Sequence, residues 1–214
     1  MIPNWPSERK RLVHLLRKRG IRDQRVLDAM AAIPREEFVP AEARLSSYQD
    51  DALPIGYGQT ISQPYMIALM GELLELRGTE TVLEVGGGCG YHAAVLGALA
   101  ARVISLELIP GLAREAASTL RRIGRDGNIE VICADGSQGW PEAAPYEGIS
   151  VAAAAPEVPP ALLEQLADPG RLVIPVGGRL DQELLVIRKA DGRTRECIAT
   201  LCRFVPLRGD GGWQ

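Results

Sequence analysis

The sequence of 214 residues is poor in the residues that build metal centres and disulfide frameworks. It has only two histidines and four cysteines, and no two cysteines form a CxxC pair. Zinc sites need such ligands at short, regular spacings, so we expect no metal. The cysteines, at positions 89, 133, 197 and 202, are scattered in a way typical of free thiols. Free thiols are typical of proteins in a reducing compartment, so we predict a cytoplasmic location.

Long apolar runs and an excess of one charge are also missing. No apolar segment approaches the roughly 18 residues that a membrane helix needs. The start, Met1 to Pro6, has no apolar segment typical of a secretory signal. The net charge is −3, which does not indicate a basic surface for nucleic acid. We therefore expect no membrane and no nucleic-acid partner, and a monomer that acts on a peptide or small molecule.

The composition is that of an ordinary globular protein, with 46% hydrophobic and 24% charged residues. This length fits one domain with a full core. We expect a single domain over 1–214, in which 1–78 carries N-terminal helices and a binding loop, and 79–214 forms an α/β core.

Within the first part, hydrophobic periodicity predicts helices over 7–31, interrupted at Gly20, and again over 63–76. Residues 34–65 are rich in proline and glycine and are expected to be irregular. A loop of this length in a compact domain is usually functional, so 45–63 is a candidate lid.

From residue 81 onward, strand and helix patterns alternate. This alternation predicts a doubly wound, mostly parallel sheet, closed by an antiparallel strand pair. The expected strands are 81–85, 102–106, 128–132, 148–152, 171–176, 184–188 and 198–205, and the expected helices are 91–99, 110–123 and 159–166.

The strongest local motif is Glu84-Val85-Gly86-Gly87-Gly88-Cys89-Gly90-Tyr91, between the first of these strands and its helix. Gly86 would let the chain turn off the strand, and Gly88 would let backbone approach a ligand without a Cβ in the way. Alone, such a loop is explained equally well by a plain turn.

Acidic residues after the next two strands strengthen the ligand interpretation. Glu107 lies 23 positions after Glu84 and can accept hydrogen bonds from ribose hydroxyls. Asp135, followed by Gly136, can accept from an exocyclic amine. A solvated strand end and a turn residue are the alternatives for Glu107 and Asp135.

The glycine spacing, ExGxGxG, differs from the GxGxxG of dinucleotide enzymes and resembles that of class I methyltransferases. That resemblance implies S-adenosylmethionine as the cofactor. Fifteen consecutive loop residues, 52–66 (ALPIGYGQTISQPYM), resemble the signature of the protein-L-isoaspartate O-methyltransferase family. Further resemblance covers REEFVP (35–40), DGSQGW (135–140), AAAPEVP (153–159), RLVIPVG (171–177) and RFVPL (203–207).

The resemblance implies transfer of a methyl group to the misplaced carboxylate of isoaspartyl residues in damaged proteins and peptides. By position, Ser62 matches the active-site serine. The implied cofactor-binding residues are Thr60, Ile61, Glu84, Gly86, Gly88, Glu107, Asp135 and Gly136, and the implied substrate-binding residues are Ile55, Gln59 and Val205. The chain departs from the family pattern at Gly87, Cys89, Glu147, Ser150 and Ala152.

An ionised carboxylate needs no general base to attack a sulfonium methyl, so we expect Ser62 to position the acceptor. The departures leave open a carboxylate or peptide methyltransferase dedicated to one biosynthetic partner. A binding module without catalysis and a Rossmann dehydrogenase are weaker alternatives.

Overall fold

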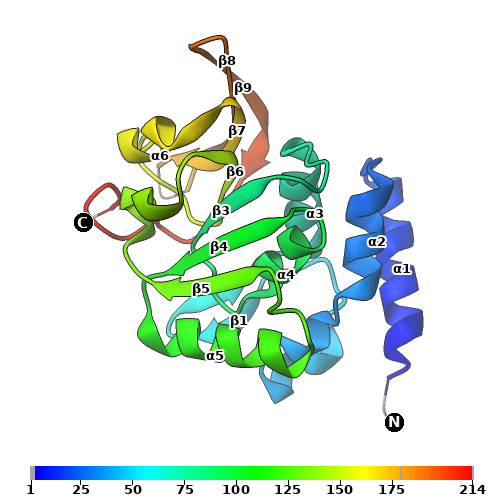
Figure 1. Cartoon of the computed structure of the whole chain (residues 1–214). Coiled ribbons are helices and arrows are strands. Elements are labelled where there is room, and N and C mark those ends of the chain that lie inside the picture. The colour runs from blue at the N-terminus through cyan, green and yellow to red at the C-terminus, as the bar shows by residue number, and fades with distance from the viewer. Residues whose placement is uncertain (1–2, 179, 214) are drawn as a thin grey trace.

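The structure is a computed structural model that describes residues 3–178 and 180–213 (Figure 1). A seven-stranded sheet has the order β5-β4-β3-β6-β7-β8-β9. The strands from β5 to β7 run parallel, and β8 and β9 add antiparallel neighbours. The predicted fold class is therefore confirmed. The strands are β3 (Thr81–Val85), β4 (Arg102–Glu107), β5 (Ile129–Cys133), β6 (Tyr146–Val151), β7 (Leu166–Gly177), β8 (Gln182–Ala190) and β9 (Arg193–Cys202).

The helices are α1 (Trp5–Lys18), α2 (Gln24–Ala32), α3 (Pro64–Leu73), α4 (Tyr91–Gly97), α5 (Pro110–Arg122) and α6 (Pro160–Glu164). Two of them begin at side-chain caps. The Asn4 carboxamide oxygen accepts from the Ser7 N–H, and the Asp23 carboxylate accepts from the Arg25 and Val26 N–H groups. Such caps satisfy amides that have no partner within the helix.

Alternate residues of the central strands enter two different cores. Val82 and Val103 face a core shared with residues of α1 to α5, while Leu83 and Ile104 face a core shared with Leu162 of α6. The covering is unequal: α6, short turns and the C-terminal segment protect the second face (Figure 1). The N-terminal helices belong to the larger core, where Leu16 and Met30 are fully buried.

The segment 34–65, expected to be irregular, contains regular structure. Two 3-10 turns, Arg35–Glu37 and Ala41–Ser46, precede an antiparallel hairpin of β1 (Leu53–Gly56) and β2 (Gln59–Ile61). Its turn places Tyr57 at a φ of 53°, between two glycines with positive φ. Strands of four and three residues are too short to show a hydrophobic period, so the prediction of an irregular segment was wrong here.

Strand boundaries also differ from expectation, most clearly at the start of β7 and at the ends of β9. β7 begins at Leu166 and passes through Asp168-Pro169-Gly170, a sequence that is typical of a turn. The last strand ends at Cys202, so residues 203–205 lie outside it. Among the described residues, no helix has the length and apolarity to cross a membrane, and no three His, Cys, Asp or Glu side chains are grouped to hold a metal ion.

Candidate active site

The glycine loop lies where β3 ends, between the neighbouring strand ends of β4 and β6. The N–H groups of Gly86 and Gly87 both donate to the Leu106 carbonyl oxygen, at 2.9 Å, which fixes the turn. Gly90 has a φ of 87°, and a Cβ there would come within 3.1 Å of the Ala116 Cβ. A glycine at this position therefore lets α4 start tightly against α5.

Glu107 closes β4 and faces the glycine loop. Its Oε2 accepts from the Gly88 N–H at 2.7 Å, and its Oε1 accepts from the Ile109 N–H at 2.8 Å. The side chain is buried. Each carboxylate oxygen carries two lone pairs, so each keeps one for a ligand hydroxyl.

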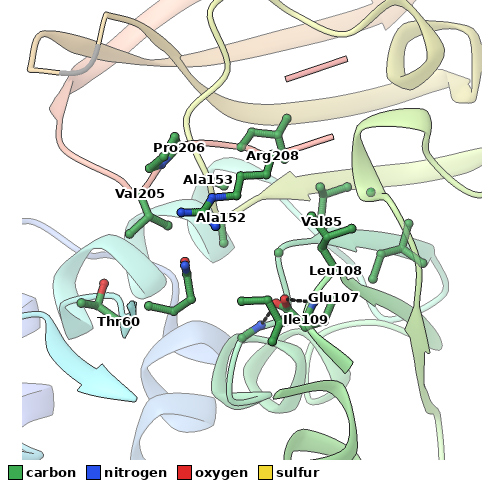
Figure 2. Close-up of a pocket in the computed structure, with 16 residues that line it drawn as sticks. Thr60, Val85, Glu107, Leu108, Ile109, Ala152, Ala153, Val205, Pro206 and Arg208 are labelled. Carbon is green, nitrogen blue, oxygen red and sulfur yellow. Dashed lines mark hydrogen bonds between the residues drawn. The ribbon is translucent and has the colours of Figure 1, made fainter. Parts of the chain in front are cut away.

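A cavity of about 590 Å³, including its open mouth, extends from the glycine loop and Glu107 (Figure 2). In Figure 2, Thr60 lies on one side of the cavity, with Val205, Pro206 and Arg208 across from Glu107. Its two charged lining residues are Glu107 and Arg208. The lining comprises Gln59, Thr60, Val85, Gly86, Gly88, Leu106, Glu107, Leu108, Ile109, Gly136, Ala152, Ala153, Val205, Pro206, Leu207 and Arg208.

A second cavity, of about 580 Å³, adjoins the first and contains Ser62. The two cavities share three lining residues: Thr60, Ala152 and Val205. A ligand in one cavity can therefore meet a ligand in the other at this common wall. The remaining lining of the second cavity is Ala52, Ser62, Gln63, Met66, Leu201, Cys202, Arg203 and Phe204.

Arg35 fixes the backbone that carries Ser62. Its guanidinium is fully buried and donates to the Ser62 carbonyl oxygen at 2.8 Å and to the Ser47 carbonyl oxygen at 2.7 Å. The guanidinium carbon also lies 5.0 Å from the centroid of the Tyr91 ring, in cation–π range. Arg35 thus connects the loop before Ser62 to the first residue of α4.

Beneath the glycine loop lies a buried polar cluster of Glu84, Ser105, His92 and Ser150. Glu84 pairs with Ser105 on β4 and with Ser150 on β6, and the Ser105 hydroxyl donates to its Oε2. Burial raises the pKa of Glu84 to about 8, with a smaller contribution from Glu107, although the Ser105 hydrogen bond opposes the shift. Burial lowers the pKa of His92 to about 4. The His92 Nδ1 and the Glu84 Oε1 are 3.5 Å apart, and the directions of the two pKa shifts favour the neutral form of both groups over an ion pair.

Two departures from the family pattern lie at this cluster. A Cβ on residue 87 would collide with the Ser105 hydroxyl, so glycine suits this arrangement. Ser150, unexpected in an apolar strand, is the cross-strand neighbour of Glu84. The Cys89 side chain is partly buried against the larger core, and burial raises the pKa of its thiol to about 11, which keeps it protonated.

The structure brings most of the predicted site residues together. Those that line the first cavity are Gln59, Thr60, Gly86, Gly88, Glu107, Gly136 and Val205, and Ser62 lines the second. Four predicted residues line neither cavity: Ile55, Ile61, Glu84 and Asp135. Both isoleucines are buried in the larger core, and the Ile55 Cδ1 lies 3.4 Å from where a Gly88 Cβ would stand.

Sequence reasoning missed Arg208 and the residues after Glu107. Leu108 and Ile109 directly follow Glu107, so their position next to a predicted cofactor residue could have identified them as part of the site. No sequence pattern marks Arg208 as a site residue. It lines the cavity because the C-terminal segment folds back beside the sheet.

Comparisons with known proteins agree with this geometry. Residues 7–211 match the family described as protein-L-isoaspartate(D-aspartate) O-methyltransferase. The chain is similar to protein-L-isoaspartate O-methyltransferase 2 of Marinobacter nauticus, with 55% identity over 91% of this chain and 90% of the relative. It is similar to the protein-L-isoaspartate O-methyltransferase of Roseiflexus castenholzii, with 53% identity over 98% of this chain and 96% of the relative.

Solved structures show the same likeness. A protein-L-isoaspartate O-methyltransferase superposes with a TM-score of 0.87 and 32% identity, over 95% of this chain and 67% of the other. A Plasmodium falciparum structure described as a putative member, in complex with S-adenosyl-L-homocysteine, superposes with a TM-score of 0.81 and 27% identity, over 97% of this chain and 99% of the other. The chain belongs to the protein-L-isoaspartate(D-aspartate) O-methyltransferase family.

Proposed function

We propose that this enzyme transfers a methyl group from S-adenosylmethionine to the α-carboxylate of isoaspartyl residues in damaged proteins and peptides, which initiates their repair. Family membership supports the reaction class. The observation that carries the assignment to these residues is the pair of adjoining cavities. One lies over the glycine loop and Glu107, the other contains Ser62, and they meet at Thr60, Ala152 and Val205.

The first cavity suits the cofactor. The free lone pairs of Glu107 suit the two neighbouring hydroxyls of a ribose, and Leu108 and Ile109 offer an apolar wall to a purine. Gly86 and Gly88 leave backbone open to the methionine portion. When bound, S-adenosylmethionine supplies a methyl group on a positively charged sulfur. A carboxylate oxygen can bond to this methyl group, and the sulfur then leaves as a neutral thioether.

The second cavity suits the acceptor. The Ser62 hydroxyl donates a hydrogen bond to the acceptor carboxylate and aims one of its oxygens toward the common wall. The acceptor is ionised near pH 7, so no residue has to remove a proton. Alignment of two reactants can account for about 7–11 kcal/mol of a barrier. The apolar side chains of Ala152 and Val205 exclude water from the meeting point.

Three further predicted residues support these contacts from behind. Ile55 packs on Gly88, and Ile61 holds the hairpin in the core. Glu84 supports the strand below the glycine loop as a neutral acid bonded to Ser105. They act on the cofactor through the backbone that they position.

A methyltransferase dedicated to one biosynthetic partner is not favoured. Near-full-length relatives from Marinobacter, Roseiflexus and Methanoregula, 50–55% identical, all carry the isoaspartate name. Two of the departures that suggested a narrower acceptor, at 87 and 150, belong to the cluster below the loop rather than to the acceptor cavity.

We also infer that the enzyme acts as a monomer of one domain in the cytoplasm, without a nucleic-acid partner. Residues of a single chain line both cavities, and one core joins the N-terminal helices to the sheet. All four cysteines are unpaired, which suits a reducing compartment. Sedimentation equilibrium of the purified protein tests the monomer.

The decisive experiment uses a matched pair of peptides that differ only in one normal or isoaspartyl linkage. With labelled S-adenosylmethionine, we expect label to enter the isoaspartyl peptide as a base-labile ester and to be absent from the normal peptide. Equal labelling of both peptides, or labelling of small carboxylic acids alone, would overturn the assignment.

A further inference from the structure

Strand β9 forms one edge of the seven-stranded sheet and leads into the cavity that contains Ser62. In the described sheet it pairs with β8 on one side only, so the backbone N–H and C=O groups of its other side face outward. Residues 193–199 are all exposed, and Leu201 and Cys202 line the cavity. Figure 1 shows β9 at the end of the sheet. A polypeptide whose damaged residue occupies the cavity can therefore continue along this edge in an extended form.

At the end of β9 that is far from the cavity, arginines form a row across three strands. Arg171 on β7 lies opposite Arg188 on β8, and Arg188 lies opposite Arg195 on β9. Residues that lie opposite each other share one face of a sheet, and like charges in this arrangement repel each other. Arg193, two positions before Arg195, adds a further positive charge on the same face.

This row is only partly neutralised. Glu75 pairs with Arg171, and it pairs with Arg188 at 3.1 Å. Within the described parts of the chain, Arg193 and Arg195 form no ion pair. Glu196 cannot neutralise them from the same face, because side chains alternate along a strand and Glu196 lies opposite Ile187. The two β9 arginines are therefore available to an acidic partner.

The turn that precedes these arginines is fixed in place. The N–H groups of Asp191 and Gly192 donate to the Asp168 carboxylate, at 3.0 and 2.6 Å. Asp191 and Gly192 have φ values of 52° and 70°, which suit a tight turn between antiparallel strands. At about 3.3 Å per residue, the strand holds Arg195 roughly 20 Å from the cavity. An extended polypeptide covers that distance with about six residues.

We propose that β9 provides a second contact for the acceptor polypeptide, in which Arg193 and Arg195 bind acidic residues about six to nine positions from the isoaspartyl residue. The intervening chain lies along the edge of β9. The inference rests on the proposed function, because the same polypeptide occupies the cavity with Ser62. It adds a preferred substrate class, clients with an acidic flank, to a reaction whose chemistry needs only the damaged residue. Because exposed ion pairs are weak, the contact gives a preference and not a requirement.

The test uses isoaspartyl peptides of one length, with the flank on the N-terminal or the C-terminal side of the damaged residue. The positions about seven to nine residues away are glutamate in one peptide and glutamine in its partner. Methyl transfer from labelled S-adenosylmethionine gives kcat and KM. For one flank direction, we expect kcat/KM to be about three- to tenfold higher with glutamate, the scale of two exposed ion pairs. The gain should appear in KM and should shrink as salt is added.

Variants of β9 assign this preference to its arginines. Arg193→Gln combined with Arg195→Gln should abolish the glutamate preference and leave kcat/KM for the glutamine peptide unchanged. The charge-reversed pair, Arg193→Glu with Arg195→Glu, should instead favour a peptide with lysine at the same positions. Arg114→Gln combined with Arg121→Gln removes two exposed arginines of α5 and is the matched control, in which the preference should remain.

Equal kcat/KM for the glutamate and glutamine peptides in both flank directions would overturn the inference. A preference that survives in Arg193→Gln with Arg195→Gln, or that disappears in the α5 control, would also overturn it. Failure of the wild type to methylate even a short isoaspartyl peptide without a flank would instead overturn the proposed function.

Discussion

At the scale of single residues, the buried guanidinium of Arg35 holds the backbone of Ser62 in position. Its backbone oxygen accepts from Arg35, so Ser62 lines the second cavity on a fixed peptide. A positioner of this kind influences the rate more than the affinity for the cofactor, because its hydrogen bond is made to the acceptor.

Ser62→Ala should therefore lower turnover of an isoaspartyl peptide by about ten- to a hundredfold, the scale of a misplaced reactant. Cofactor affinity, measured by calorimetry, should stay within twofold of the wild type. Ser118→Ala, an exposed serine on α5, is the control and should retain full turnover. Lost cofactor binding with normal residual turnover would contradict the assigned role.

Glu84 leads to a prediction about pH. The native state keeps its proton to about pH 8, whereas the unfolded chain releases it near pH 4.5. The free energy of unfolding therefore falls as the pH rises between these values. His92 acts in the opposite sense: its native pKa of about 4 lies below 6.5, so its contribution is present above pH 6.5 and is lost as the pH falls toward 4.

Glu84→Gln keeps the Ser105 hydrogen bond and removes the titration. Between pH 6.5 and 8 the wild type should lose about 1–2 kcal/mol of stability relative to this variant, by linkage of about 1.4 kcal/mol per pH unit. Urea unfolding at both pH values measures the difference, with the exposed Glu196→Gln as the control. A parallel pH dependence of wild type and Glu84→Gln would contradict a neutral Glu84.

At the scale of elements, the β1–β2 hairpin forms one side of the cofactor cavity. Its second strand provides Gln59 and Thr60 to the lining, and Ile55 from the first strand packs on Gly88. The turn docks on α5, where the Tyr57 hydroxyl donates to Glu115 at 3.4 Å and the ring covers Gly111.

Gly111→Ala should displace Tyr57, because the new methyl group would collide with the end of its ring. We expect cofactor affinity to fall about two- to fivefold, the effect of losing one surface contact of up to about 1 kcal/mol. Tyr57→Ala should have the same effect. Gly127→Ala, with nothing within 4 Å, serves as the control. If Gly111→Ala and Tyr57→Ala both bind the cofactor with wild-type affinity, the contact of the hairpin turn with α5 does not contribute to cofactor binding.

Elements with a clear hydrophobic pattern could be predicted from the sequence. Elements whose structure depends on contacts with distant residues could not. β3 begins and ends where Thr81–Val85 predicted, because five apolar-rich residues precede a glycine turn. Gly86, Gly88 and Glu107 follow from strand ends that parallel topology brings to one edge. The hairpin and the C-terminal segment depend on contacts across more than 50 residues, such as Tyr57 with Glu115 and Asp210 with Asp135, which no local pattern records.

At the scale of the whole molecule, ligand binding should be visible as stability. The cofactor cavity is built from the hairpin, the ends of β3, β4, β5 and β6, and the C-terminal residues 205–208, so unfolding destroys it completely. S-adenosylhomocysteine at a hundred times its dissociation constant should therefore stabilise the fold by about 2.7 kcal/mol.

For a chain of this size that corresponds to a rise in Tm of about 5–10 °C, measured by calorimetry or circular dichroism. Glu107→Gln, at the same ligand concentration, should show a smaller rise, because one carboxylate oxygen becomes an amide nitrogen and can no longer accept. An equal rise in both proteins would remove Glu107 from the cofactor site.

The common wall at Thr60, Ala152 and Val205 has a consequence for proteins damaged at several places. Apart from the shared Thr60, the exposed lining residues of the two cavities differ, with Leu108 and Arg208 on the first and Leu201 and Arg203 on the second. We therefore expect the spent donor to leave from the first cavity while a long client polypeptide stays docked at the second. Repeated rounds of esterification on one client would then need no new encounter between the two macromolecules.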